Sequence, residues 1–142
     1  MKIKFKKLNE EALIPEFQTK GSAGMDIHSI ESVILNPMDF KIVKTGLAVE
    51  IPNGYEIQVR PRSGMACKKG ITVINSPGTI DADYRSEIGV GLINLSNSST
   101  LISKGDRIAQ LIVNKIEYPE VEVVSELSET DRGSGGFGST GK

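Results

Sequence analysis

Two aspartates and a tyrosine stand close together in the segment GTIDADYR, residues 78–85, which connects two apolar stretches. A carboxylate such as Asp81 can act as a general base toward water, and the ring of Tyr84 offers a flat wall for a sugar. The exposed backbone of a hairpin could read the edge of a base, so the segment could form the nucleoside side of a pocket. The same composition suits an Asx-rich hairpin turn with no further role, and the pattern alone favours that simpler interpretation.

A second candidate is the run Arg60-Pro61-Arg62-Ser63-Gly64, which follows an alternating strand pattern and precedes the best helix-like turn of the chain, residues 65–68. Ser63 is a residue type that favours helix N-caps. The free N–H groups of the first turn, with the Arg62 guanidinium, would then form an anion site. Two arginines on a solvated strand end explain the run equally well.

Two further segments combine polar groups with small or apolar neighbours. In Gly21–Asp26 the small residues let another backbone approach closely and place the Asp26 carboxylate at the edge of a site. In Gly105–Ile112 a turn leads into a buried strand, and Gln110 is a polar side chain among apolar ones. A buried glutamine needs hydrogen-bond partners, and a ligand could be one of them.

The last eleven residues, RGSGGFGSTGK, contain five glycines and one aromatic ring. This segment can bury almost nothing by itself, so it is expected to be mobile when no ligand is bound. A disordered tail is one interpretation. The spacing of Arg132 and Phe137 along a freely flexible chain favours another, a flap that closes over a ligand.

The elements that must position these residues are short strands. Apolar and polar residues alternate in residues 2–5, 40–43, 47–51, 55–59 and 121–123, which predicts strands. Residues 71–74, 88–95 and 108–113 are more continuously apolar, as expected for strands buried on both faces. Turn residues separate these segments, and about ten short strands with such turns predict a β-sandwich, jelly roll or barrel.

Composition limits the partners and the compartment. The chain has 142 residues, enough for one domain, with 17 Lys and Arg against 18 Asp and Glu. A formal net charge of -1 gives no chain-wide positive field for a long nucleic acid, so a small phosphorylated metabolite is the favoured ligand. Cys67 is the only cysteine and no stretch has signal-peptide or membrane-span character, which predicts an intracellular, cytoplasmic protein without membrane contact.

In order along the chain, these segments resemble the five motifs of the trimeric dUTPase family. The matching segments are AGMDI at 23–27, RSGMA at 62–66, GTIDADYR at 78–85, GDRIAQ at 105–110 and RGSGGFGSTG at 132–141. One such motif would be weak evidence, but five in register across residues 21–141 are specific. Ser86 is a departure, because the family commonly has glycine after the Tyr-Arg pair.

The resemblance implies an all-β, jelly-roll-like β-barrel or sandwich that assembles as a homotrimer, with each active site built from three subunits. Residues 1–124 would form the barrel, and residues 125–142 a mobile glycine-rich arm that closes over an active site. The implied reaction is hydrolysis of dUTP to dUMP and pyrophosphate, which limits uracil incorporation into DNA and supplies dUMP for dTMP synthesis.

The resemblance also implies roles for single residues. Asp81 would deprotonate the water that attacks the α-phosphorus, Tyr84 would stack on the deoxyribose, and Asn75 lies where the hairpin meets the base. The implied phosphate ligands are Arg62, Ser63, the Gly64 N–H and Gln110, with Arg132 as γ-phosphate clamp, Phe137 as lid over the uracil, and Gly138, Ser139 and Thr140 as further arm contacts. Mg²⁺ would sit on the triphosphate oxygens, with Asp26 as an outer-sphere partner.

Two other functions compete with this interpretation. A dCTP deaminase shares the implied fold and an Arg-Ser segment, but it needs a glutamate base, whereas residues 80–84 have the hydrolase pattern. A catalytically silent regulatory protein would be favoured by loss of the polar motif residues, and none is lost.

Overall fold

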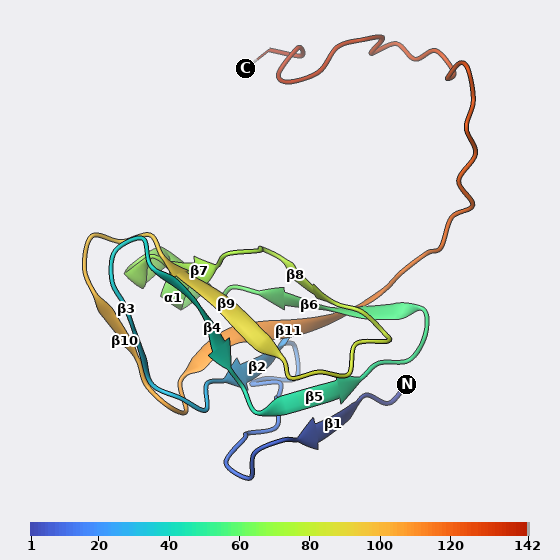
Figure 1. Ribbon diagram of the computed structural model, residues 1–142. Helices are drawn as coiled ribbons and strands as arrows, with labels where there is room; N and C mark the ends of the chain where they lie inside the picture. Colours follow the sequence, from blue (N-terminus) through green and yellow to red (C-terminus); the bar gives the residue numbers. More distant parts are fainter. Residues whose placement is uncertain (142) are drawn as a thin grey trace.

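The computed structural model describes residues 1–141, which form eleven strands and one short helix (Figure 1). The elements are β1 (Lys4–Lys7), β2 (Met25–His28), β3 (Val33–Leu35), β4 (Phe40–Lys44), β5 (Leu47–Glu50), β6 (Tyr55–Arg60), α1 (Ser63–Lys69), β7 (Ile71–Val73), β8 (Gly78–Ile80), β9 (Gly89–Asn94), β10 (Thr100–Ile102) and β11 (Arg107–Lys115). The predicted all-β class is confirmed.

All strand pairs are antiparallel and fall into four small sheets. The largest sheet has the order β2-β11-β6-β8, and a three-stranded sheet has the order β4-β9-β7. The pairs β1-β5 and β10-β3 complete the body, which encloses one continuous apolar core. Strand β11 lies between β2 and β6. It therefore brings the AGMDI segment, which includes most of β2, close to the RSGMA segment, which follows β6.

Side-chain alternation predicted four of these strands. The segments predicted at 40–43, 47–51 and 55–59 match β4, β5 and β6 within two residues, and the predicted first strand lies two residues later, at β1. Strands β2, β3, β8 and β10 were not predicted, and three of these, β3, β8 and β10, have only three residues, which is too few to show a period of two.

The prediction that the apolar strands are buried on both faces is wrong for this chain. In β9 the buried residues alternate with partly or fully exposed ones. In β11 the buried residues are Ile108, Ala109 and Leu111, and the other residues are half-buried or exposed. One face of each strand packs on the core, while the other face, which includes Ile93 and Ile112, is only half-buried.

Helix α1 occupies the place predicted for a helical turn, but its N-cap differs from the prediction. The N-cap is Arg62, with extended backbone and no side-chain capping hydrogen bond, and Ser63 is the first helical residue. The helix therefore begins one residue earlier than an N-cap at Ser63 would place it. It ends at Gly70, whose positive φ of 67° lets its N–H reach the carbonyls of Ala66 and Met65.

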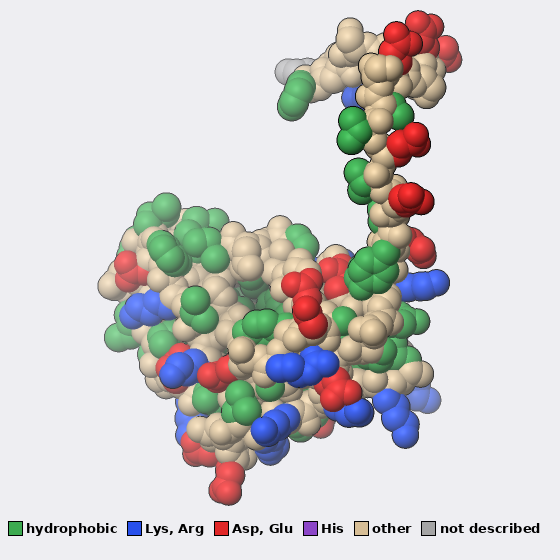
Figure 2. Space-filling model, turned by 45° about the vertical axis from the view of Figure 1, so that its right-hand side comes forward, with side chains coloured by type: hydrophobic (Ala, Val, Ile, Leu, Met, Phe, Trp, Pro, Cys, Tyr) green, Lys and Arg blue, Asp and Glu red, His purple; other side chains and the backbone are tan. Residues whose placement is uncertain are grey.

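Beyond β11 the chain leaves the body and extends away from it (Figure 1). The strand predicted at Val121–Val123 is wrong: the segment is extended but pairs with no strand among residues 1–141. Alternation in this segment puts acidic side chains along one edge and apolar ones along the other (Figure 2). The apolar side chains lie in solvent, with Val123 95% and Leu127 86% exposed. The final residue of the predicted arm, 142, lies outside the described residues.

Candidate functional site

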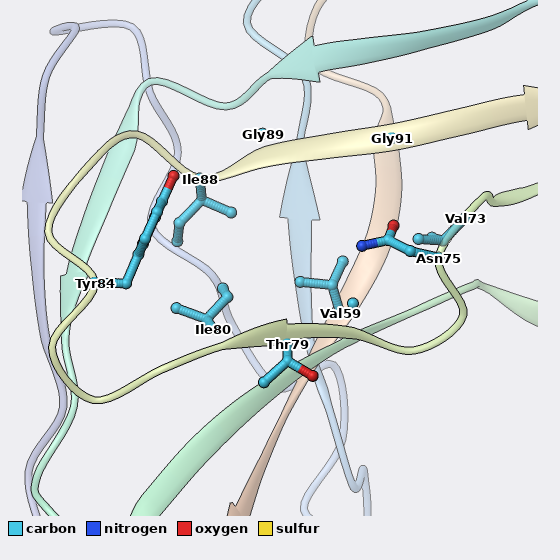
Figure 3. Close-up of a pocket in the computed structure, with 10 residues that line it drawn as sticks. Val59, Val73, Asn75, Thr79, Ile80, Tyr84, Ile88, Gly89 and Gly91 are labelled. Atoms are coloured by element: carbon cyan, nitrogen blue, oxygen red, sulfur yellow. The ribbon is translucent and has the colours of Figure 1, made fainter.

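One pocket lies between β8 and the start of β9, beside the connecting segment that contains the two aspartates and the tyrosine (Figure 3). Its apolar walls come from strands β6, β7, β8 and the residue before β9: Val59, Val73, Ile80 and Ile88. Tyr84 stands at one end of the pocket and Asn75 at the other (Figure 3). The remaining lining is Thr79 and the backbone of three glycines. A flat ring and a polar end group fit such an apolar slot, so its chemistry suits a nucleobase and its sugar.

Gly78 packs closely against this pocket. A Cβ built on Gly78 would lie 3.2 Å from Asn75 Nδ2 and 3.3 Å from Val59 Cβ. A larger residue would therefore require Asn75 or Val59 to shift by a few tenths of an ångström. The glycine run that the sequence shows as a turn signal thus also sets the shape of the slot.

The turn after β8 is held by its own hydrogen bonds. The Tyr84 N–H donates to the Asp81 carbonyl at 3.1 Å, and the Tyr84 hydroxyl donates to the Glu87 carbonyl at 2.8 Å. Arg85 Nη1 donates to the Ala82 carbonyl at 2.7 Å. Ser86 is absent from the non-glycine residues with positive φ, so the departure from the family's glycine introduces no backbone strain here.

Asp81 does not line the pocket that holds Tyr84 and Asn75. It is exposed and lines a separate shallow hollow with Asn53, Asp83 and Tyr118, at the root of the C-terminal segment. The side chains that the sequence grouped in one motif therefore face two different places on this chain.

A third hollow gathers residues of three other motifs, the segments AGMDI, RSGMA and GDRIAQ. It is lined by Asp26, Arg62, Ser63, Gly64 and Gln110, which are all predicted site residues, and by Gln18, Ser22, Ala23, Gly24 and Arg107. Sequence reasoning assigned no role to Arg107 or Gln18. Arg107 had a signal, because it is a cation inside the GDRIAQ motif at the start of a buried strand.

Strand pairing brings these side chains together. Gln110 on β11 lies opposite Asp26 on β2 and, on its other side, opposite Arg60 on β6. The loop that follows β6 is therefore next to β11, and Gln110 Nε2 donates to the Pro61 carbonyl at 2.9 Å. The Gln110 side chain was expected to need a hydrogen-bond partner, and in this structure that partner is the Pro61 carbonyl. A Cβ on Gly24 would lie 2.8 Å from Gln110 Oε1, so only glycine leaves room for this side chain.

The Asp26 carboxylate lies between two guanidinium groups. Arg62 Nε is 3.4 Å from Oδ1, and Arg107 Nη1 donates to Oδ2 at 3.1 Å. The Asp26 side chain is only 12% exposed, and these cations offset part of the cost of burying its charge. Arg62 Nη1 also donates to the Arg107 carbonyl at 3.2 Å, which ties the two arginine segments directly.

His28 lies beside this group, paired with Arg107 across β2 and β11. Partial burial lowers the pKa of the His28 imidazole, Asp26 opposes that shift, and Arg107 and Arg62 add to it. Its buried Nδ1 has no hydrogen-bond partner among the described residues. His28, which the sequence left without a role, is therefore a neighbour of the arginine-lined hollow.

Asp81 and Arg62 lie at opposite ends of strand β6. Ile80 is opposite Ile57 and Gly78 is opposite Val59, so β8 runs toward the start of β6 and delivers Asp81 there. Arg62 follows the other end of β6. About six residues separate the two levels, or roughly 20 Å at the rise of an extended strand. One chain therefore does not bring Asp81 and Arg62 to a common ligand.

The predicted arm residues lie on the C-terminal segment that extends away from the body, coloured red in Figure 1. Arg132 Nε donates to the Gly135 carbonyl at 2.9 Å within the arm itself. Phe137 has a positive φ of 49° and is fully exposed, and Gly138, Ser139 and Thr140 are part of the same tight turns. In this conformation none of them contacts the rest of the predicted site.

The described part of the chain has no group of three or more His, Cys, Asp or Glu side chains that would hold a metal ion. Within residues 1–141, no helix is long and apolar enough to cross a membrane.

Comparisons with known proteins agree with the motifs. The family model described as dUTPase matches residues 10–141. The deoxyuridine 5'-triphosphate nucleotidohydrolase of Nautilia profundicola is 61% identical over 142 residues, covering 100% of both chains.

Two solved structures are similar as well. The dUTPase of Staphylococcus bacteriophage 80alpha with dUPNHPP has a TM-score of 0.92 and 33% identity, covering 99% of each chain. A mutant dUTPase from phage phi11 of S. aureus, described with a structural Mg(II) ion, has a TM-score of 0.84 and 29% identity, covering 91% of this chain and 100% of that one. The chain therefore belongs to the dUTPase family.

Proposed function

We propose that this dUTP diphosphatase cleaves dUTP to dUMP and pyrophosphate by attack of water on the α-phosphorus, with Asp81 as the general base. Hydrolysis of dUTP is the activity named for the matching relatives. The observation that carries the proposal is the pair of complementary hollows. One is an apolar slot with Tyr84 and Asn75, and the other is an arginine-lined hollow with Arg62 and Gln110.

The two hollows divide the substrate between them. The slot takes the uracil and deoxyribose, where the Tyr84 ring stacks on the sugar and leaves no room for a 2′-hydroxyl. Asn75 and the hairpin backbone meet the base edge. Arg62, Ser63, the Gly64 N–H and Gln110 hold the phosphates, since guanidinium and N–H donors match phosphate oxygens.

Charge neutralisation must precede the attack. A triphosphate carries about four negative charges, which repel an approaching hydroxide, so cations at the phosphates lower the barrier before a base can help. Arg62 and the arm's Arg132 supply part of this charge, and Mg²⁺ on the phosphate oxygens supplies more. Asp81 contributes by its position within hydrogen-bond reach of the attacking water.

The separation of Asp81 from Arg62 supports a site shared between subunits of a homotrimer. A general base and a phosphate cation must both reach one triphosphate, and roughly 20 Å along β6 is too far for that within one chain. Exposed apolar side chains also favour assembly, among them Phe40 and Ile42 on β4 and Val121 and Val123 in the segment after β11. Contact with another subunit would remove these apolar side chains from water.

The arm completes the proposed site. Arg132 clamps the γ-phosphate, Phe137 covers the uracil, and Gly138, Ser139 and Thr140 contact the phosphates. Its glycines allow the backbone to adapt to a ligand, and closure excludes bulk water from the reaction. Its extended position away from the body supports a reach toward another subunit (Figure 1).

A cytoplasmic location is part of the proposal. It is supported by the single cysteine, Cys67, which is exposed and cannot form a disulfide within the chain.

The test begins with a substrate panel. Purified protein is incubated with Mg²⁺ and each of dUTP, dCTP, dTTP and UTP, and pyrophosphate, inorganic phosphate and ammonia are measured. The proposal expects pyrophosphate from dUTP far above the others. Ammonia released from dCTP would instead identify a deaminase, and tight dUTP binding without pyrophosphate would identify a silent binder.

The general base is tested by Asp81→Asn, which removes the base but almost no volume. We expect kcat to fall at least ~10²-fold while binding of a non-hydrolysable dUTP analogue changes little. The matched control is Asp83→Asn in the same turn. Near-normal turnover by Asp81→Asn would remove Asp81 from the mechanism.

A further inference from the structure

We propose that Thr45 and Glu87 are positioning residues that set the discrimination between deoxyribose and ribose triphosphates by fixing the ring of Tyr84. This inference rests on the proposed function, in which Tyr84 stacks on the sugar. Thr45 and Glu87 lie outside the five motif segments and line neither the apolar slot nor the arginine-lined hollow. They would act on the substrate only through the position of Tyr84.

The ring of Tyr84 is held in place mainly by hydrogen bonds. Tyr84 is 40% exposed at the end of the slot, so packing by its neighbours does not enclose it. Its hydroxyl points toward the start of β9 (Figure 3) and donates to the Glu87 carbonyl at 2.8 Å. The far end of the ring is therefore fixed only as firmly as the backbone at Glu87.

The backbone at residues 87 and 88 is bound to the turn between β4 and β5. Glu87 Oε1 accepts a hydrogen bond from the Gly46 N–H at 2.8 Å. The Ile88 N–H donates to the Leu47 carbonyl at 2.7 Å, and the Thr45 hydroxyl donates to the Ile88 carbonyl at 2.6 Å. Three hydrogen bonds thus join two consecutive residues beside the slot to one turn.

The β4–β5 turn is itself closely packed. Thr45 is fully buried, and Gly46 has a positive φ of 67°. A Cβ built on Gly46 would lie 3.0 Å from Ala12 Cβ and 3.1 Å from Asn9 Cβ, so only glycine fits this backbone and this space. The Gly46 carbonyl also accepts a hydrogen bond from the Leu8 N–H at 2.8 Å. The turn therefore offers a rigid support for the segment that contains Tyr84.

Rejection of a ribose requires a wall that does not move. The two sugars differ by one hydroxyl group, and an apolar pocket rejects an added hydroxyl only modestly. A displacement of about 1 Å in a positioning group can change catalysis by orders of magnitude. Because Thr45 and Glu87 support the wall without lining either hollow, their loss should change the preference between dUTP and UTP and leave the phosphate contacts in place.

The test measures kcat/KM for dUTP and for UTP on one preparation of each assembled variant. A fraction of misfolded protein lowers both values equally, so the ratio reports only the selectivity. In Glu87→Ala we expect the ratio of dUTP to UTP to fall about fivefold, because the Gly46 N–H loses its acceptor. Thr45→Val keeps the shape of the side chain and removes its donor, and it should change the ratio in the same direction.

Conservative variants distinguish the hydrogen bonds from the mere presence of a side chain. Glu87→Gln keeps an oxygen acceptor and Thr45→Ser keeps the hydroxyl, so both should retain a ratio within about twofold of wild type. Glu31→Ala is the matched control. Glu31 Oε1 accepts the Lys44 N–H at 2.8 Å, directly before the same turn, but Glu31 lies between β2 and β3. Its loss should leave the ratio unchanged, and an equal fall in Glu31→Ala would overturn the proposal.

A double-mutant cycle tests whether the effect passes through Tyr84. In the Tyr84→Ala background, Glu87→Ala should change the ratio less than about twofold, because the ring that it positions is gone. The same factor in both backgrounds would overturn the proposal. So would an unchanged ratio in Glu87→Ala.

Failure of this inference differs from failure of the proposed function. A wild-type protein that does not hydrolyse dUTP would refute the proposed function itself. An unchanged ratio in Tyr84→Ala would refute the sugar role of Tyr84 and this inference with it. An altered ratio in Tyr84→Ala together with a wild-type ratio in Glu87→Ala and Thr45→Val would refute only this inference.

Discussion

Two inactive variants of this protein should restore activity to one another. The first variant is Asp81→Asn, which removes the proposed general base, and the second is Arg62→Ala, which removes the proposed phosphate cation. In the structure these residues lie at opposite ends of β6, roughly 20 Å apart by strand rise. A ligand that contacts both must therefore receive them from different subunits.

The expected recovery follows from the symmetry of the assembly. In a cyclic homotrimer each site would take Asp81 from one chain and Arg62 from a neighbour. After random mixing of equal amounts, the Asp81 donor is intact in about half of the sites, and so is the Arg62 donor. About a quarter of the sites are then intact, so activity should reach roughly a quarter of wild type.

The assay compares each variant alone with a mixture that has been unfolded and refolded together, measured by pyrophosphate release from dUTP. Subunit exchange must be checked by giving one variant a charge or mass label and isolating mixed oligomers. A mixture of Asp81→Asn with Asp81→Ala is the matched control and should stay inactive. Confirmed mixed oligomers with no recovered activity would show that Asp81 and Arg62 of one chain serve the same site.

Three other perturbations address the sugar, the arm and pH. Tyr84→Ala should raise UTP hydrolysis relative to dUTP, because the wall beside the 2′ position is lost, and an unchanged ratio of kcat/KM values would place sugar selection elsewhere. Truncation after Asp131 should give a folded oligomer with little activity, since it removes Arg132 and Phe137 but no core residue, and normal turnover by the truncated protein would contradict the role of the arm. Burial lowers the pKa of His28 below its ordinary 6.5, so the unfolded chain binds the extra proton first as pH falls. Stability present above pH 6.5 should therefore be lost as the pH falls toward the folded pKa of His28. His28→Gln should reduce that loss in urea unfolding at fixed protein concentration, and identical pH profiles for the two proteins would refute the assignment.

The strands could be predicted where they are long enough to show a period. Strands β4, β5 and β6 have four to six residues each, and each was predicted within two residues. Strands β3 and β10 have three residues each, and they exist because they pair with one another across 65 or more positions of sequence. Alternation misled at Val121–Val123, because a strand needs a partner and the described chain provides none there.

The chemical identity of the site was determined by the sequence. The order of the five motifs and the residue types within them combine carboxylates, a tyrosine, arginines and a glycine-rich C-terminal segment on one chain, and the family membership agrees with them. These features are local, so they can be recognised before any fold is known.

Only the tertiary structure decided how those residues are distributed. The register of β8 on β6 separates Asp81 from Arg62, and the register of β2 on β11 places Asp26 between Arg62 and Arg107. Both registers join segments far apart in sequence, and a shift of one residue would turn every side chain to the opposite face. The energy that fixes them comes from the apolar core and the hydrogen-bond ladders of the whole domain, so no single motif contains that information.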